Sequence, residues 1–183
     1  MPPVMNAAEI KELYDRKARA MARRPVFARG SGHACARLVG KGLTCEVDLE
    51  DRTVRVDQPA GEGGAGSAAH PGQLMRASLA ACVAMGYRIW AARLEVPLDG
   101  VEVALTVDFD ARGQAGLAEE VAVGWQHLHM DVVVTTSAAE AEVRRVVETA
   151  DRLSPMLANI DPRVERSSRL TIVRPSGEGA GRG

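Results

Sequence analysis

Cys82 is the side chain of this sequence best suited to nucleophilic chemistry. It lies in the uncharged apolar stretch 77–87, where a cysteine reacts only if a positively charged group holds its thiolate. Its neighbours one helical turn away are Ser78 and Gly86, so an arginine would have to reach it from a strand or another chain. Without such a partner, a buried cysteine is an inert, small hydrophobic residue. Cys82 is therefore either a nucleophile or a packing residue.

Two further cysteines, Cys35 and Cys45, lie on either side of a turn at 40–42, and we expect them near each other. Three cysteines cannot form a closed set of disulfides, and none of them belongs to a CxxC pair or has zinc-ligand spacing. Because reduced thiols are typical of the cytoplasm, the cysteine count favours a cytoplasmic protein.

His127 and His129 are two positions apart in a predicted strand, so their side chains face the same way, as metal ligands would. A third ligand would have to come from His33, His70 or Asp131, and no recognisable ligand set accompanies the pair. Two histidines on a solvent-facing side of a strand are the commoner explanation. We therefore predict no metal site.

The glycine-rich segment 61–66 matches the pattern GxGxxG, which joins a strand to a helix in dinucleotide-binding folds. Here Pro59 intervenes, and the following helix starts several residues after the last glycine. The next strand also carries no acidic residue at the position that such a fold requires. We predict a flexible loop and no cofactor.

Hydrophobic patterns around these residues predict an α+β fold. Asn6 and Glu9 form a capping-box signal for an amphipathic helix, which Pro25 ends. Pro71 is suited to be the first residue of a long helix, and Ser137 to cap a later one. The other predicted elements are a three-stranded antiparallel meander in 32–57, strands at 101–110, 124–136 and 164–173, and a helix at 138–153 before a short helical turn at 154–155. Because the strands come in groups, we expect mostly antiparallel sheets.

Composition and charge exclude several classes of protein. The 183 residues are 46% hydrophobic but only 3% aromatic, which predicts one domain with a core of Ala, Val and Leu. A net charge of −1 argues against nucleic acid as a partner. The longest uncharged apolar stretch is too short to span a bilayer, and the first residues do not resemble a secretory signal. We expect a cytoplasmic protein without a membrane partner.

The apolar stretch 77–87 has no polar stripe on any side of its helix. Such a helix has to be covered on every side, which a single sheet cannot do. The sequence therefore predicts that either a second layer of helices or a partner subunit covers it.

A series of motifs resembles the OsmC/Ohr family of osmotically inducible and organic-hydroperoxide-resistance proteins. In chain order they are Asp57-Gln58-Pro59, a glycine-rich loop, Pro71-Gly72-Gln73-Leu74, Ala77-Ser78-Leu79-Ala80-Ala81-Cys82, Asp108-Phe109-Asp110-Ala111-Arg112-Gly113, Gly124-Trp125-Gln126 and Ser154-Pro155. The similarity spans about 29–173. It implies an OsmC-like fold, with antiparallel sheets around a long central helix, and an intertwined homodimer with its sites at the subunit interface.

The resemblance also implies roles for single residues. Active members of the family reduce organic hydroperoxides with a cysteine at the position of Cys82, which forms a sulfenic acid and then a disulfide with a second cysteine. This sequence has Ser154 where the second cysteine would precede Pro155, so that disulfide cannot form. Gly72 stands where the hydroperoxide-reducing members have an assisting glutamate.

The arginine that stabilises the thiolate in the family has more than one counterpart here. Arg37 lies near the expected place, and Lys41 or Arg29 could equally serve. Cys35 or Cys45 could substitute as the second thiol, or could merely pack within the sheet.

These features favour an OsmC-like protein of the oxidative-stress response, from a branch that lacks the second cysteine. The expected site residues are Cys82, Arg37 and Ser154, and Cys82 would reduce organic hydroperoxides as a one-cysteine thiol peroxidase recycled by an external thiol. The alternative is a non-catalytic dimer of the same fold that binds a small hydrophobic ligand. The expected organisation is an N-terminal amphipathic helix extension at 1–25, an OsmC-like domain at 26–174 and a disordered glycine-rich tail at 175–183.

Overall fold

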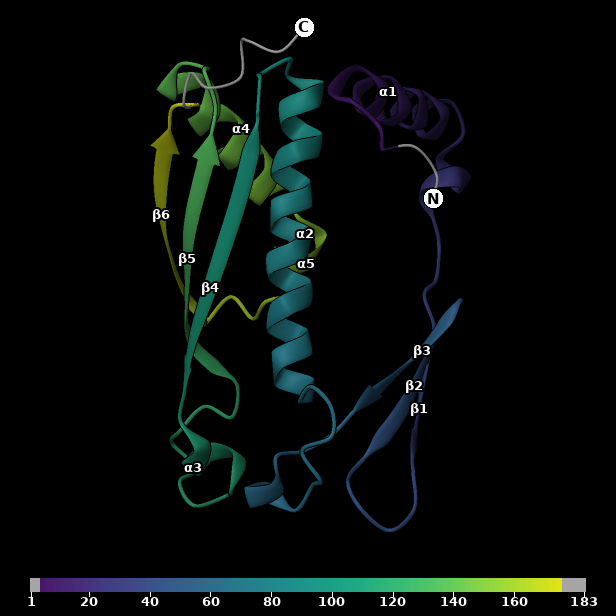
Figure 1. The fold of residues 1–183 in the computed structure, drawn as a ribbon, viewed down its shortest axis with the longest axis vertical. Coiled ribbons are helices and arrows are strands. Elements are labelled where there is room, and N and C mark those ends of the chain that lie inside the picture. The colour runs from purple at the N-terminus through teal and green to yellow at the C-terminus, as the bar shows by residue number, and fades with distance from the viewer. Residues whose placement is uncertain (1–3, 176–183) are drawn as a thin grey trace, which may run out of the picture. The chain divides into compact units, whose positions relative to one another are not determined.

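The structure is a computed structural model that describes residues 4–175. Its elements are, in chain order, α1 (Ala7–Arg23), η1 (Pro25–Ala28), β1 (Ala34–Leu38), β2 (Cys45–Leu49), β3 (Arg52–Val56), η2 (Ala60–Glu62), α2 (Pro71–Arg93), β4 (Gly100–Phe109), α3 (Ala111–Gln114), β5 (Trp125–Thr135), α4 (Glu140–Arg152), α5 (Pro155–Ala158) and β6 (Glu165–Val173) (Figure 1). The described chain divides into two compact units. The larger unit comprises residues 4–16 and 79–175, and the smaller unit comprises residues 17–78. The α+β class is confirmed.

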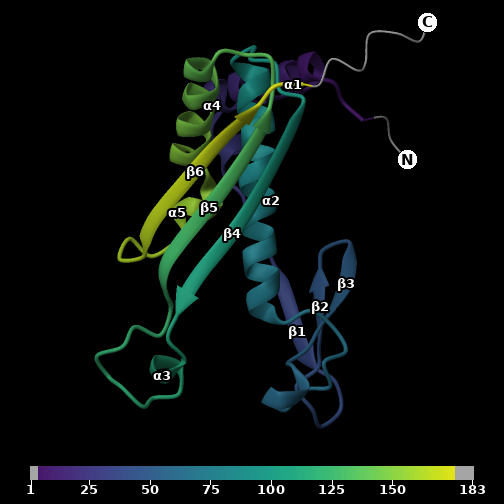
Figure 2. The same cartoon turned by 60° about the vertical axis from the view of Figure 1, so that its left-hand side comes forward.

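The larger unit is built on the sheet β4-β5-β6. β5 pairs antiparallel with β4 and parallel with β6, where His127 lies opposite Glu165 and Thr135 opposite Val173. Three of the four strand pairings in the described chain are antiparallel, as expected, and the pair of β5 and β6 is the exception. A parallel neighbour requires the chain to return to the edge where β5 begins, and the segment that contains α4 and α5 makes this crossover (Figure 2).

Strict alternation along β5 separates the two faces of this sheet. From His127 to Thr135 every second residue is buried, and the side chains between them are half-buried. The buried side chains face α4 and the part of α2 that belongs to the larger unit, both of which lie on one face of the sheet (Figure 2). This core contains Leu128, Met130, Val132 and Val134 of β5, Leu79, Val83, Tyr87 and Ala91 of α2, and Val143, Val146 and Ala150 of α4.

The caps of two helices show how far local signals hold. At the start of α1, the Glu9 N–H donates to Asn6 Oδ1 at 3.0 Å and the Asn6 N–H donates to Glu9 Oε2 at 2.8 Å, which confirms the capping box. The prediction of Ser137 as a cap was wrong. The helix α4 begins two residues later than predicted, with Ala139 at the cap position and its N–H donating to the Glu142 carboxylate at 3.1 Å.

The smaller unit contains the predicted antiparallel meander β1-β2-β3. Its register places Cys35 opposite Asp48 and Cys45 opposite Leu38. Because neighbouring positions of a strand point to opposite faces, Cys35 and Cys45 lie on opposite faces of this sheet. The two residues therefore lie on neighbouring strands, as expected, but their thiols point away from each other.

A buried carboxylate organises the glycine-rich loop that follows β3. Asp57 is 1% exposed and accepts the N–H groups of Gln58 (2.9 Å), Ala65 (3.2 Å) and Ser67 (2.9 Å), as well as the Ser67 hydroxyl (2.8 Å). These bonds, above all those from Ser67, lower the pKa of Asp57. The loop predicted as flexible is thus held by one side chain, and the N–H groups of Ala65 and Ser67 are directed to that carboxylate instead of to a cofactor phosphate.

The long helix α2 is not covered on every side within one chain. Leu79, Val83 and Tyr87 are buried, whereas Ala81 is exposed and Met85 is 59% exposed.

Among residues 4–175, no helix is both long enough and apolar enough to cross a membrane. The predicted glycine-rich tail lies, from residue 176 onward, outside the part of the chain that the structure describes.

Candidate functional site

A cavity of about 390 Å³ lies in the larger unit between α2 and the α4–α5 junction. Cys82 lines it together with residues one, two and three turns further along α2, among them Gly86, Ile89 and Arg93, which a helix brings to one side. Its volume lies within the range of about 300–1,000 Å³ that is typical of small-molecule sites. Cys82 is half-buried on the wall of this cavity, so its sulfur is not sealed in a core.

Ser154 lies in the wall of the same cavity and also starts the short helix α5. Its Oγ accepts the Leu157 N–H at 3.3 Å, and its residue is 9% exposed. Pro155 follows as the first helical residue, as the sequence predicted. The structure thus brings two of the three expected site residues, Cys82 and Ser154, to one cavity.

Arg37, the third expected site residue, belongs to the smaller unit. Its guanidinium donates to Asp48 Oδ2 at 2.6 Å, and it lies 3.8 Å from Cys35 Sγ. The hydrogen bond with Asp48, more than any other interaction, raises the pKa of Arg37. Its hydrogen bonds are therefore made within the sheet β1-β2-β3.

The carboxyl group of Asp151 is a cavity residue that sequence reasoning missed. It accepts a hydrogen bond of 2.8 Å from the hydroxyl of Tyr87, a side chain that is fully buried in the core. Burial raises the pKa of Asp151, and the Tyr87 hydrogen bond opposes that increase. Burial also raises the pKa of Tyr87, helped by the negative charge of Asp151. The usable signal was a tyrosine within an apolar helix, because a buried hydroxyl needs a partner.

Replacing Tyr87 with phenylalanine should raise the pKa of Asp151 further, because the hydrogen bond that favours its charged form is lost. In the folded state the pKa is raised, so the contribution of Asp151 to stability is complete below its unfolded pKa of about 3.9 and is lost as pH rises through the folded value. Unfolding in urea across pH 3–8 should show this loss moving to higher pH in the variant. The double variant with Asp151→Asn should not show the shift, and its persistence there would assign the effect to another group.

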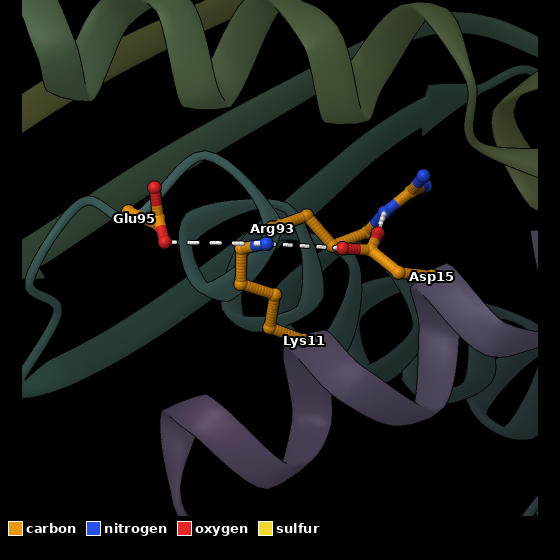
Figure 3. Close-up of polar contacts among 4 residues, drawn as sticks. All are labelled: Lys11, Asp15, Arg93 and Glu95. Atoms are coloured by element: carbon orange, nitrogen blue, oxygen red, sulfur yellow. Dashed lines mark hydrogen bonds and ion pairs between the residues drawn. The ribbon is translucent and has the colours of Figure 1, made fainter.

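Aromatic and charged side chains complete the cavity. Tyr14 of α1 lines it, and so does Trp90, over whose ring the Arg93 guanidinium lies at 4.4 Å from the centroid. The Arg93 Nε donates to Asp15 Oδ1 at 3.2 Å (Figure 3). No local pattern predicts this contact, since α1 and the end of α2 are far apart in sequence.

The two histidines of β5 do face the same way, with ring centroids 6.3 Å apart. His127 Nε2 lies 2.9 Å and His129 Nδ1 lies 2.8 Å from the hydroxyl oxygen of Ser167. Asp108 lies 3.3 Å from His127 Nδ1. Within residues 4–175, no group of three His, Cys, Asp or Glu side chains is arranged to hold a metal ion.

Comparison with known proteins identifies a family by sequence. The family model described as OsmC-like protein matches residues 63–167, which include Cys82 and Ser154. No curated protein matches the chain in sequence.

Solved structures share the fold at low sequence identity. An OsmC-like protein from Mycoplasma pneumoniae has a TM-score of 0.67 and 12% identity, and the match covers 79% of this chain and 98% of that one. For an organic hydroperoxide resistance protein OsmC from Legionella pneumophila, the TM-score is 0.60, the identity 22% and the coverage 78% and 97%. A putative organic hydroperoxide resistance protein from Vibrio cholerae has captopril bound in one of its active sites. Its TM-score is 0.55 and its identity is 21%, and the match covers 77% of this chain and 91% of that one.

Proposed function

This chain belongs to the OsmC-like family, and from that premise we propose that it reduces organic hydroperoxides at Cys82 with electrons from an external thiol. The observation that carries the proposal is the position of Cys82, half-buried on the wall of a cavity large enough for a small organic molecule. The Legionella and Vibrio proteins of the same fold are named for organic hydroperoxide resistance, and the Vibrio protein binds a small organic molecule in an active site.

The proposed reaction has three balanced steps. The Cys82 thiolate attacks the outer oxygen of ROOH, which breaks the O–O bond and gives Cys82–SOH and, after protonation of the alkoxide, ROH. A thiol R′SH then displaces water from the sulfenic sulfur to give a mixed disulfide. A second R′SH displaces the Cys82 thiolate and leaves R′SSR′, so that one hydroperoxide consumes two thiols.

Ser154 supports the use of an external thiol. It lines the same cavity as Cys82 at the sequence position where the family has its second cysteine, and a hydroxyl cannot form a disulfide. Cys35 and Cys45 lie on opposite faces of one sheet, so at most one of them can face any given site. A cytoplasmic location, which the unpaired cysteines favour, would supply the thiols.

Arg37 is the proposed cation that holds the Cys82 thiolate, because its position in the sequence is near that of the family's arginine, and Lys41 and Arg29 are the alternatives. In that role its guanidinium would give up part of its contact with the Asp48 carboxylate and bind the thiolate instead. Asp151 is a second proposed participant: its carboxyl group, on the wall of the same cavity as Cys82, would give the alkoxide its proton.

A homodimer is also proposed. Ala81 and Met85 leave an apolar strip of α2 exposed, which agrees with a family arrangement in which two such helices pack together. Sedimentation of the full chain distinguishes a dimer from a monomer.

The proposed domain organisation has the OsmC-like domain at 26–174 and an extension at 1–25, which the family model does not reach.

The deciding experiment measures the consumption of cumene hydroperoxide with a dithiol reductant. Wild-type protein should exceed the rate of the reductant alone, and Cys82→Ser should fall to that background because no sulfenic acid can form. Cys45→Ser is the matched control and should keep the wild-type rate. Equal rates for wild type and Cys82→Ser would overturn the proposal.

The same fold also suits a second function, a dimer that binds a small hydrophobic ligand without catalysis. The mainly apolar cavity and the helix-capping role of Ser154 favour it. The alkylation rate of Cys82 against pH separates the two functions. A thiol that titrates well below the reference pKa of about 8.5 supports the peroxidase, and one that titrates at or above it supports the binding protein.

A further inference from the structure

The first half of α1 contributes to the wall of the Cys82 cavity although it lies outside the segment that matches the family model. Residues 4–16 belong to the same compact unit as Cys82, and Tyr14 lines the cavity directly. The match to the family model begins at residue 63. Any property that α1 gives to the cavity is therefore a property of this chain and not of the matched segment.

A network of charges joins α1 to the end of α2 (Figure 3). Asp15 Oδ1 accepts the Arg93 Nε–H at 3.2 Å, and Asp15 Oδ2 accepts a hydrogen bond from Lys11 Nζ at 3.1 Å. Lys11 Nζ also lies 3.9 Å from Glu95 Oε1. The hydrogen bond from Lys11, followed by that from Arg93, lowers the pKa of Asp15 against the effect of burial, so Asp15 is charged at neutral pH.

Arg93 is the only member of this network that lines the cavity within the described chain. Its side chain is 25% exposed and lies on Trp90, and its charge therefore faces a space with mainly apolar walls. An unpaired guanidinium in such a place would attract a carboxylate or sulfonate, because charge-assisted hydrogen bonds strengthen where water is scarce. Asp15, whose side chain is 26% exposed, neutralises that charge from the α1 side.

We propose that Asp15 makes the Cys82 cavity selective for uncharged apolar ligands by neutralising Arg93, while Tyr14 forms the adjoining wall. Asp15 is a specificity-determining residue in this assignment and touches no reacting atom. The inference rests on the proposed function in one respect, namely that the selected ligand is the hydroperoxide. The selectivity itself is a property of binding and exists whether or not Cys82 reacts.

Two dyes of similar size that differ in charge test this selectivity in the full chain. N-phenyl-1-naphthylamine is uncharged, and 1-anilinonaphthalene-8-sulfonate carries one negative charge on a similar ring system. Asp15→Asn should raise the affinity for the sulfonate by about tenfold, the effect of a charge-assisted hydrogen bond. The affinity for the uncharged dye should stay within about twofold of the wild type.

Two further variants serve as controls. Glu95→Gln removes a carboxylate from the same network, but Glu95 is 78% exposed and does not line the cavity, so neither affinity should change. The double variant Asp15→Asn with Arg93→Gln should return the affinity for the sulfonate to the wild-type value. Protection of Cys82 from N-ethylmaleimide at pH 8.5, where even an ordinary thiol is reactive, places the dyes in the cavity.

Each remaining outcome overturns the inference. If Asp15→Asn changes the affinity for both dyes equally, Asp15 only holds α1 in place. If the gain for the sulfonate survives the loss of Arg93, the charge that attracts it is another one. Because the dye measurements do not involve turnover, a protein without peroxidase activity can still show the selectivity, and an active peroxidase can lack it.

Discussion

Replacing Ser154 with cysteine is expected to give a protein that forms one internal disulfide with Cys82 after one equivalent of organic hydroperoxide. Both residues line the same cavity, so the introduced thiol can attack the sulfenic sulfur of Cys82 and release water. The intact mass should then be two hydrogens lower than in the reduced variant, and peptide mapping without reductant should recover the linked peptides. The wild type should instead accumulate the sulfenic acid.

Loss of the Ser154 hydroxyl has a cost that must be separated from this gain. The Oγ caps α5 through the Leu157 N–H, and removing such a cap typically costs about 1 kcal/mol of stability. Ser137→Cys is the matched control, because Ser137 is exposed and does not line the cavity. If the introduced thiol at 154 stays reduced while Cys82 accumulates as the sulfenic acid, as in the wild type, the two positions do not cooperate.

Replacing Leu128 with alanine should lower the free energy of unfolding by about 2–5 kcal/mol, the usual cost of such a cavity in a core. Leu128 is fully buried where β5 packs against α2 and α4, and α2 carries Cys82. Val133 is the matched control, since it lies on the other face of β5 and is half-buried.

Unfolding in guanidinium chloride, followed by circular dichroism, provides the comparison. Val133→Ala should lower the free energy of unfolding much less than Leu128→Ala, because the Val133 side chain is only half-buried. Similar losses at both positions would mean that the second face of the sheet is as fully packed as the first, contrary to the alternation along β5.

Local sequence signals predicted much of this fold because they concern residues close together in the chain. The capping box of Asn6 and Glu9, the start of α2 at Pro71 and the capping of α5 by Ser154 depend on contacts within one helical turn. The meander β1-β2-β3 depends on short turns. Cys82 and Ser154 were accessible to sequence reasoning because family motifs surround each of them.

Features set by long-range contacts were not predictable in the same way. The parallel pairing of β6 with β5 depends on a crossover of about thirty residues, which no periodicity reveals. The start of α4 was also missed. Ser137 is a good capping residue, but the helix begins after Ala139, whose N–H donates to the Glu142 carboxylate. The bond between Tyr87 and Asp151 and the ion pair between Asp15 and Arg93 join residues more than sixty positions apart.

The buried carboxylate of Asp57 gives the loop behind β3 an attachment that redox chemistry does not touch. A disulfide in its place would open in the reducing thiols that the proposed reaction consumes, and a thiol in its place could be oxidised by the hydroperoxide. A carboxylate exchanges only a proton, and its lowered pKa keeps it charged until the medium is strongly acidic. The segment that leads into the helix of Cys82 is thus tethered by a group that is inert to both the oxidant and the reductant.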